Sequence, residues 1–182
     1  AFSQDPENWH LLVLYGDVPL LRASTLSELM ERHLLEAAGV TVLSARLNHP
    51  KGYGRILRNQ SGEFRRITED KDLLPEEQVL DEVNSGIYTF RLGPLLSALA
   101  ELKANNAQQE YYLTDTLEIA LHAGHRVSIF QLADAAEISG INTPEQLADA
   151  EAVLCARRVA GNGEGCAVCQ LLRDGSPLVL RR

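Results

Sequence analysis

Short runs of consecutive apolar residues alternate along this chain with segments in which apolar residues recur every three or four positions. The first run, Leu11 to Leu14, is typical of a strand that is buried on both faces in a parallel sheet. Residues 25–37 carry the helical spacing, and residues 40–45 form the next apolar run. A strand, a helix and a strand in that order predict a right-handed crossover between parallel strands.

The same alternation continues to about residue 154. A hairpin is expected where two short apolar strands, residues 55–58 and 64–68, flank a turn at Gly62. Further strands are expected at residues 82–90 and 126–130, and further helices after Gly93, before Gly124 and after Thr143. We therefore predict an α/β fold with a doubly wound mixed sheet, a main domain over residues 1–154 and an atypical tail over residues 155–182.

One acidic residue stands where such a sheet binds its ligands. Gly16 allows a sharp turn after the first strand, Asp17 follows it, and Pro19 prevents the strand from continuing. In open α/β sheets, ligands bind beyond the carboxyl ends of the strands. A carboxylate there is suited to a hard cation such as Mg²⁺ when the ligand carries phosphate. The alternative is an aspartate that only caps the following turn.

The composition narrows the possible partners. With 45% hydrophobic residues the chain can bury a core, and its formal net charge is −8. That sign argues against general binding to nucleic acid or to an anionic membrane. No apolar run approaches the roughly 18 residues of a membrane span, and the first residues do not have the pattern of a signal peptide. We expect a cytoplasmic protein.

All the cysteines of the chain lie near its end, at Cys155, Cys166 and Cys169. The last two have the spacing of half a zinc site or of a redox pair. A structural zinc ion takes four ligands, and a redox pair opens a helix after a strand, whereas these cysteines follow a glycine-rich segment. We expect ordinary reduced thiols.

Six short segments, taken in order and at their intervals, resemble one family. The first reads Leu-Tyr-Gly-Asp-Val-Pro-Leu and the second Gly-Tyr-Gly-Arg-Ile. The six segments are residues 14–20, 52–56, 69–72, 82–86, 108–115 and 140–142. They closely resemble the uridylyltransferase half of the bacterial bifunctional N-acetylglucosamine-1-phosphate uridylyltransferase/glucosamine-1-phosphate acetyltransferase family, and the resemblance implies its Rossmann-like fold.

The resemblance also implies roles for individual residues. Asp17 and Asn142 match the two ligands of the catalytic Mg²⁺ ion. The substrate-binding positions that match are Tyr15 and Gly16 beside the nucleotide, Gly54, Glu69 and Asn84 around the N-acetylglucosamine unit, and Tyr112 and Thr114 in the same pocket. Gln109 stands where the family commonly has glycine.

The implied reaction is an in-line attack by the phosphate oxygen of N-acetylglucosamine-1-phosphate on the α-phosphorus of UTP. The products are UDP-N-acetylglucosamine and pyrophosphate. Such a transfer depends on positioning and on charge neutralisation more than on covalent chemistry by the protein.

Three parts of that family have no counterpart in this sequence: the first strand with its glycine-rich, basic phosphate loop, the segment that reads uracil, and the left-handed β-helix. We therefore expect the chain alone to be impaired. The edge of the first strand is expected to be exposed, which favours a homodimer or a complementing chain.

Two other functions stay open. The chain is a non-catalytic remnant or interaction module that binds sugar nucleotide weakly, or it is a sugar-1-phosphate nucleotidyltransferase with a different sugar or base, such as a glucose-1-phosphate thymidylyltransferase.

Overall fold

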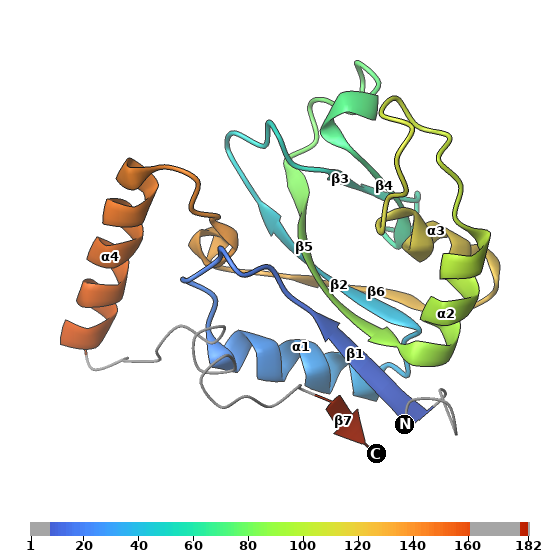
Figure 1. Ribbon diagram of the computed structural model, residues 1–182, viewed down its shortest axis with the longest axis horizontal. Coiled ribbons are helices and arrows are strands. Elements are labelled where there is room, and N and C mark those ends of the chain that lie inside the picture. Colours follow the sequence, from blue (N-terminus) through green and yellow to red (C-terminus); the bar gives the residue numbers. More distant parts are fainter. Residues whose placement is uncertain (1–7, 161–178, 182) are drawn as a thin grey trace.

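The computed structural model describes residues 8–160 and 179–181 and builds them around one mixed β-sheet (Figure 1). Its strands are β1 (Trp9–Val13), β2 (Val40–Arg46), β3 (Arg55–Arg58), β4 (Phe64–Thr68), β5 (Glu82–Arg91), β6 (Val127–Gln131) and β7 (Val179–Arg181). The long strand β5 pairs with β2 on one edge and with β1 and the start of β3 on the other. Only β2 and β6 pair in parallel among the described strands.

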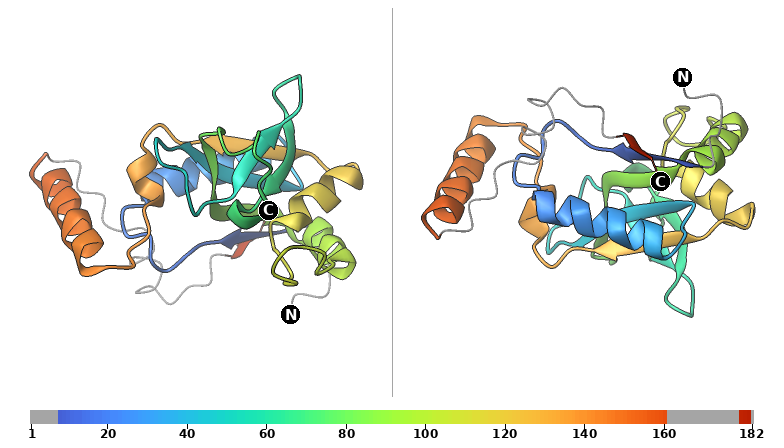
Figure 2. Two further views of the ribbon diagram at one scale, coloured as in Figure 1. Left: turned by 90° about the horizontal axis from the view of Figure 1, so that it is seen from above. Right: turned by 90° about the horizontal axis from the view of Figure 1, so that it is seen from below.

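Helices cover both faces of this sheet, as the alternating pattern predicts. They are α1 (Ala23–Leu35), α2 (Leu92–Glu101), α3 (Asp115–His122) and α4 (Pro144–Val159), with short 3₁₀ turns η2 (Asp70–Asp72) and η3 (Ala135–Ile138). Helix α1 lies on one face, α2 and α3 lie on the other, and α4 stands to one side of the sheet (Figures 1 and 2). In the described part of the chain, every helix is too short or too polar to cross a bilayer.

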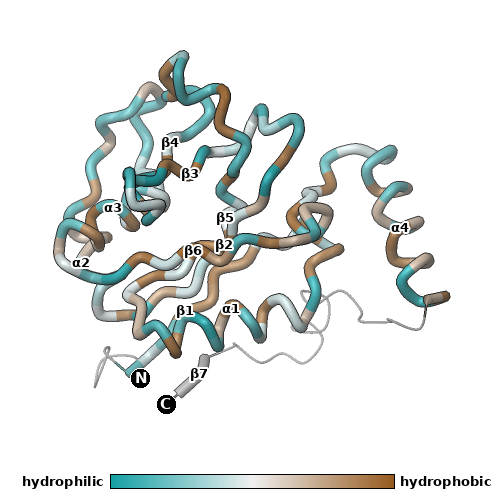
Figure 3. The backbone as a smooth tube through the Cα atoms, turned by 180° about the vertical axis from the view of Figure 1, so that it is seen from behind, coloured by the Kyte–Doolittle hydropathy of each residue, from teal (hydrophilic) through white to brown (hydrophobic). Residues whose placement is uncertain are grey.

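The alternation of side chains along β2 divides the core in two. Leu43 and Ala45 point to the face covered by α1, and Val40 and Val42 point to the face covered by α2 and α3. All four are completely buried. Hydrophobic residues alternate with polar ones along the central strands (Figure 3). This rigid centre supports the loops that follow the strands.

The prediction for the first strand is wrong in two respects. Strand β1 is antiparallel to β5, and its side chains are half-buried, with Leu11 39% exposed. The cause is its position: β1 lies near the edge of the sheet, and both β1 and β2 run against β5, which separates them. The connection from β1 through α1 to β2 therefore crosses over β5.

The outer edge of β1 is paired, contrary to the expectation of a bare edge. Strand β7 runs antiparallel to it and pairs with residues Trp9 to Leu11, with His10 opposite Leu180. A second chain could pair at this part of the edge only if β7 left it. The predicted dimer or complementing chain stays a prediction.

The tail is described only in part. Helix α4 carries Cys155, which is exposed and has a free thiol. Cys166 and Cys169 lie outside the described residues. The predicted division of the chain after residue 154 stays a prediction.

A buried histidine on α1 is held in its neutral form. His33 is completely buried, and its ring lies 2.9 Å from Thr41 Oγ1 on one side and 2.9 Å from His10 Nδ1 on the other. Burial, with the neighbouring His10 and Arg91, lowers the pKa of His33 from 6.5 to about 4.

This burial makes the stability of the domain depend on pH. The unfolded chain binds a proton at His33 near pH 6.5, whereas the folded chain resists it until about pH 4. Stability is therefore complete above pH 6.5 and falls as the pH drops toward 4, by up to about 1.4 kcal/mol per pH unit. Urea unfolding at pH 7, 6 and 5 measures this slope. The slope should flatten in His33→Gln, and an equal slope in both proteins would contradict the assignment.

Candidate functional site

The six segments singled out in the sequence meet around one pocket of about 640 Å³, and each contributes lining residues. Of the nine predicted site residues, eight line this pocket: Tyr15, Asp17, Gly54, Glu69, Asn84, Tyr112, Thr114 and Asn142. Gly16 is the ninth, and it lies between Tyr15 and Asp17 without being part of the lining. The fold thus brings together residues that are up to 127 positions apart (142 − 15).

Asp17 and Asn142 both line the pocket and both lie close to Gly140. Asp17 follows β1 in a turn, and its carbonyl oxygen accepts a hydrogen bond of 2.9 Å from the backbone N–H of Ile141. Gly140 lies between the two side chains: a Cβ atom placed there would be 3.2 Å from Asp17 Oδ2 and 3.7 Å from Asn142 Nδ2. The missing side chain leaves a small space between a carboxylate and an amide.

That donor set fits a hard divalent cation. A carboxylate and an amide oxygen are ligands that Mg²⁺ accepts, with the remaining positions taken by water and by phosphate oxygens of a substrate. The amide of Asn142 presents nitrogen toward Gly140, so a half-turn of its terminal group would bring the oxygen to the cation.

Strand β5 is irregular where it lines the pocket. Its register with β2 shifts between Val42 and Ser44, and Gly86 has φ +76°. Ser85 Oγ donates to the carbonyl of Leu43 at 2.6 Å, which satisfies a backbone group that the shift leaves without its strand partner. Asn84 and Gly86, which are poor strand formers, therefore lie in the irregular part of β5 that lines the pocket.

Gly86 also makes room for an aromatic ring. A Cβ atom at this position would lie 1.9 Å from Cε2 of Tyr15, closer than any real contact allows. The Tyr15 ring therefore lies against the backbone of β5, although the residue is half exposed. The loop after β1 and the bulge of β5 are thus fitted to each other.

The amide of Asn84 is held in one orientation. Its Oδ1 accepts from the backbone N–H of Gly86 at 3.1 Å, and its Nδ2 lies 2.7 Å from the hydroxyl of Tyr88. Burial raises the pKa of Tyr88 above its ordinary value, so this hydroxyl stays protonated and neutral. Asn84, which lines the pocket, therefore has an amide in a defined orientation, with one amide hydrogen beyond the contact to Tyr88.

Glu69 is placed by contacts on two sides. Thr114 Oγ1 donates to Glu69 Oε1 at 3.0 Å, and the other carboxylate oxygen lies 3.2 Å from the position of a Cβ atom on Gly54. A side chain at Gly54 would therefore displace the carboxylate. The oxygens of Glu69 are acceptors suited to sugar hydroxyls.

The segment around residues 105–113 is tied to η2. Lys71 Nζ donates to Gln108 Oε1, Gln108 Nε2 donates to the hydroxyl of Tyr112 at 2.6 Å, and Asp72 Oδ1 accepts from the backbone of Ala107 at 3.0 Å. These bonds attach to η2 a segment of which Gln108 and Tyr112 line the pocket. Next to them Gln109 has φ +55°, a left-handed conformation in which glycine is favoured.

We expect Gln109→Gly to raise the free energy of unfolding by about 0.5–1 kcal/mol, because glycine removes the left-handed strain of this position. Gln78→Gly is the matched control, since Gln78 is exposed and its φ is not in the left-handed region. The control should lose stability. Urea unfolding measures both, and a loss of stability in both variants would contradict the reading.

The sequence did not single out two useful residues of the pocket. Lys51 is the one lysine or arginine among the lining residues, and the hydroxyl of Tyr88 is hydrogen-bonded to the amide of Asn84. Lys51 directly precedes the second segment, so its position near the pocket could have been predicted. Tyr88 is four positions from Asn84 in a strand, and only the bulge at Gly86 brings the two side chains together.

Known proteins share both the sequence and the fold. The nucleotidyl transferase family model matches residues 1–154. The bifunctional protein GlmU of Corynebacterium glutamicum is 52% identical over 149 residues, which are 82% of this chain and 31% of that protein. The bifunctional protein GlmU of Acetivibrio thermocellus is 45% identical over 148 residues, or 81% of this chain and 32% of that protein.

A solved structure from Bacillus anthracis, described as a glucose-1-phosphate thymidylyltransferase, superposes with a TM-score of 0.58 over 80% of this chain and 55% of that chain. At 23% identity it shows the fold alone, and it confirms the predicted Rossmann-like, doubly wound sheet. The resemblance carried by the six segments is confirmed as well, because the two relatives align with four-fifths of the chain. The chain belongs to the nucleotidyl transferase family.

Proposed function

We propose that this pocket binds UDP-N-acetylglucosamine with Mg²⁺, and that it forms the sugar and cation side of a site for nucleotidyl transfer from UTP to N-acetylglucosamine-1-phosphate. The observation that carries the proposal is the convergence of all six segments on one pocket. The chain spans 31% and 32% of the length of the two relatives. The activity that a full-length protein would have is therefore proposed for this chain as well.

The proposed chemistry assigns a task to each side chain. Asp17 and Asn142 would hold Mg²⁺, which supplies charge neutralisation for the phosphates of both substrates. Glu69 accepts hydrogen bonds from sugar hydroxyls, and Asn84 donates to the acetamido oxygen. Tyr15 lies against the nucleotide. These contacts align the attacking phosphate oxygen with the α-phosphorus, which is the main requirement of an in-line transfer.

The charge of the pocket favours binding over turnover for this chain by itself. The charged residues among the lining residues are Lys51 and the two carboxylates Asp17 and Glu69. A triphosphate brings several further negative charges, which one lysine and one divalent cation do not balance. We propose that these residues alone turn over slowly.

A sugar-nucleotide-binding module without catalysis is the second candidate, and the same charge balance favours it. Pyrophosphate release from UTP and N-acetylglucosamine-1-phosphate with Mg²⁺ separates the two. The enzyme hypothesis expects release that stops in Asp17→Ala. Binding of UDP-N-acetylglucosamine without any release would establish the module instead. Absence of both would refute the proposed function.

We expect Tyr88→Phe to weaken binding of UDP-N-acetylglucosamine by about fivefold, or about 1 kcal/mol, because Asn84 loses the hydroxyl that fixes its amide. Calorimetric titration measures the affinity. Ser128→Ala serves as the control, since it also removes a buried hydroxyl that donates a hydrogen bond, to Glu36, and Ser128 is outside the pocket lining. An equal loss of affinity in the two variants would mean that the amide of Asn84 does not depend on Tyr88.

A further inference from the structure

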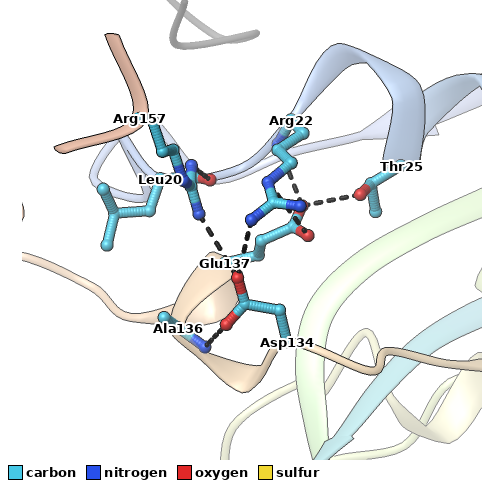
Figure 4. Close-up of polar contacts among 7 residues, drawn as sticks. All are labelled: Leu20, Arg22, Thr25, Asp134, Ala136, Glu137 and Arg157. Atoms are coloured by element: carbon cyan, nitrogen blue, oxygen red, sulfur yellow. Dashed lines mark hydrogen bonds and ion pairs between the residues drawn. The ribbon is translucent and has the colours of Figure 1, made fainter. Parts of the chain in front are cut away.

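Four charged residues form a cluster at the start of α1, and they come from three separate parts of the chain (Figure 4). Arg22 Nη2 lies 2.8 Å from Asp134 Oδ2, and Arg22 Nε lies 3.7 Å from Glu137 Oε1. Arg157 Nη2 lies 3.5 Å from the same oxygen of Asp134. Two guanidinium groups thus balance two carboxylates, and we call these four residues the arginine–carboxylate cluster.

Glu137 holds the start of α1 against η3. It is 3% exposed, and its Oε2 accepts from the backbone N–H of Arg22 at 3.0 Å and from Thr25 Oγ1 at 2.6 Å. Arg22 is the N-cap residue of α1. A carboxylate at that end of a helix meets unpaired N–H groups and the positive end of the helix dipole. Asp134 similarly accepts from the N–H of Ala136 at 3.1 Å.

Arg157 joins α4 to this arrangement from the other side. It lies near the end of α4, its side chain is 11% exposed, and its Nη1 donates to the carbonyl of Leu20 at 2.6 Å. Ala150 is the one fully buried residue of the helix. With so little apolar contact, the guanidinium of Arg157 is the main polar attachment of the last turns of α4.

The cluster braces the two segments that carry the cation ligands. Asp17 lies three positions before Leu20, and Asn142 lies five positions after Glu137. Helix α4 begins at Pro144, just after Asn142, and runs about 20 Å to Arg157, which returns to the Asp17 segment. The segments therefore touch at the Ile141–Asp17 backbone bond and are joined again through α4.

We propose that Arg157 is a positioning residue that sets the spacing of Asp17 and Asn142 through Leu20 and Asp134, and so couples helix α4 to the cation affinity of the pocket. The inference rests on the proposed cation site. This role differs from a purely structural one, because Asp17 and Asn142 lie on the two different segments that Arg157 connects. Loss of the Arg157 contacts should change the spacing of Asp17 and Asn142 while the sheet stays folded.

The test is the affinity for Mn²⁺, used in place of Mg²⁺, in the presence of UDP-N-acetylglucosamine and followed by electron paramagnetic resonance. Arg157→Gln should weaken Mn²⁺ binding by about tenfold, as loss of a group that orients metal ligands does elsewhere. Arg158→Gln removes the same charge one position along α4 and should bind as the parent does. Arg157→Lys keeps the charge but not the forked geometry, and should fall between them.

Two further readouts separate positioning from general destabilisation. Hydrogen exchange at the Ile141 amide should speed up in Arg157→Gln and not in Arg158→Gln, because that amide donates to Asp17. The effects of Arg157→Gln and Asp134→Asn on Mn²⁺ affinity should be less than additive, because the two side chains are partners in one ion pair. Equal Mn²⁺ affinities of Arg157→Gln and Arg158→Gln would overturn the inference. Failure of the parent protein to bind Mn²⁺ would instead overturn the cation site itself.

Discussion

Replacing Asp17 with alanine should remove the Mg²⁺ dependence of UDP-N-acetylglucosamine binding while leaving the fold intact. Asp17 is exposed and stands in a turn after β1, so its side chain contributes little to the core. Its Oδ2 lies 3.2 Å from the position of a Cβ atom on Gly140, close to the amide of Asn142. We expect affinity in the presence of Mg²⁺ to fall by about 100-fold, or about 2.7 kcal/mol.

Calorimetric titration with and without Mg²⁺ checks this expectation. Asp149→Ala is the matched control, because Asp149 is an exposed aspartate of α4 outside the pocket lining. The parent and the control should bind more tightly with Mg²⁺, and Asp17→Ala should bind equally weakly in both conditions. If Mg²⁺ still strengthens binding by Asp17→Ala to the parental degree, Asp17 only caps its turn.

Replacing Gly86 with alanine should lower the affinity of the pocket for UDP-N-acetylglucosamine by more than it lowers the stability of the fold. The new methyl group would overlap the Tyr15 ring, whose nearest atom lies 1.9 Å away, so the ring must leave its place. The left-handed backbone adds about 1 kcal/mol of strain. We expect UDP-N-acetylglucosamine affinity to fall by about 30-fold, or about 2 kcal/mol, because the moved ring no longer supports the nucleotide.

Gly62→Ala provides the comparison for strain alone. Gly62 has φ +80° in the β3–β4 turn, and a Cβ atom there would meet nothing within 4 Å. Both variants should lose about 1 kcal/mol of unfolding free energy, and only Gly86→Ala should lose affinity. Parental affinity in Gly86→Ala would show that Tyr15 has no part in binding.

Most of the elements were predictable because their signals are local. The helix expected after Thr143 is α4, which opens with a capping box of Thr143 and Gln146 and has Pro144 in its first turn. The hairpin of β3 and β4 likewise turns at Gly62. Such signals depend on residues within one turn of each other.

The neighbours of β1 were not predictable in the same way. A run of apolar residues such as Leu11 to Leu14 shows that a strand is partly buried, but not which strands flank it or in which direction they run. The pairing of β7 with β1 joins residues about 170 positions apart, and the tail carries no periodic pattern to announce it.

The candidate site likewise has one part that was predictable from local sequence and one part that was not. The six segments are contiguous motifs, and their residues could be singled out before the structure placed them around one pocket. The arginine–carboxylate cluster could not, because Arg22 and Arg157 are 135 positions apart (157 − 22) and each alone reads as an ordinary surface charge. Only the return of α4 toward Leu20 gives them a common role.

The most direct test of the proposed site is to map bound Mn²⁺ by paramagnetic broadening of assigned amide signals, with UDP-N-acetylglucosamine present. The account predicts broadening centred on the residues around Asp17 and Gly140–Asn142, extending toward Gly86, and its loss in Asp17→Ala. Broadening that is centred elsewhere, or that persists unchanged in Asp17→Ala, would contradict the claim that this pocket holds a cation between Asp17 and Asn142.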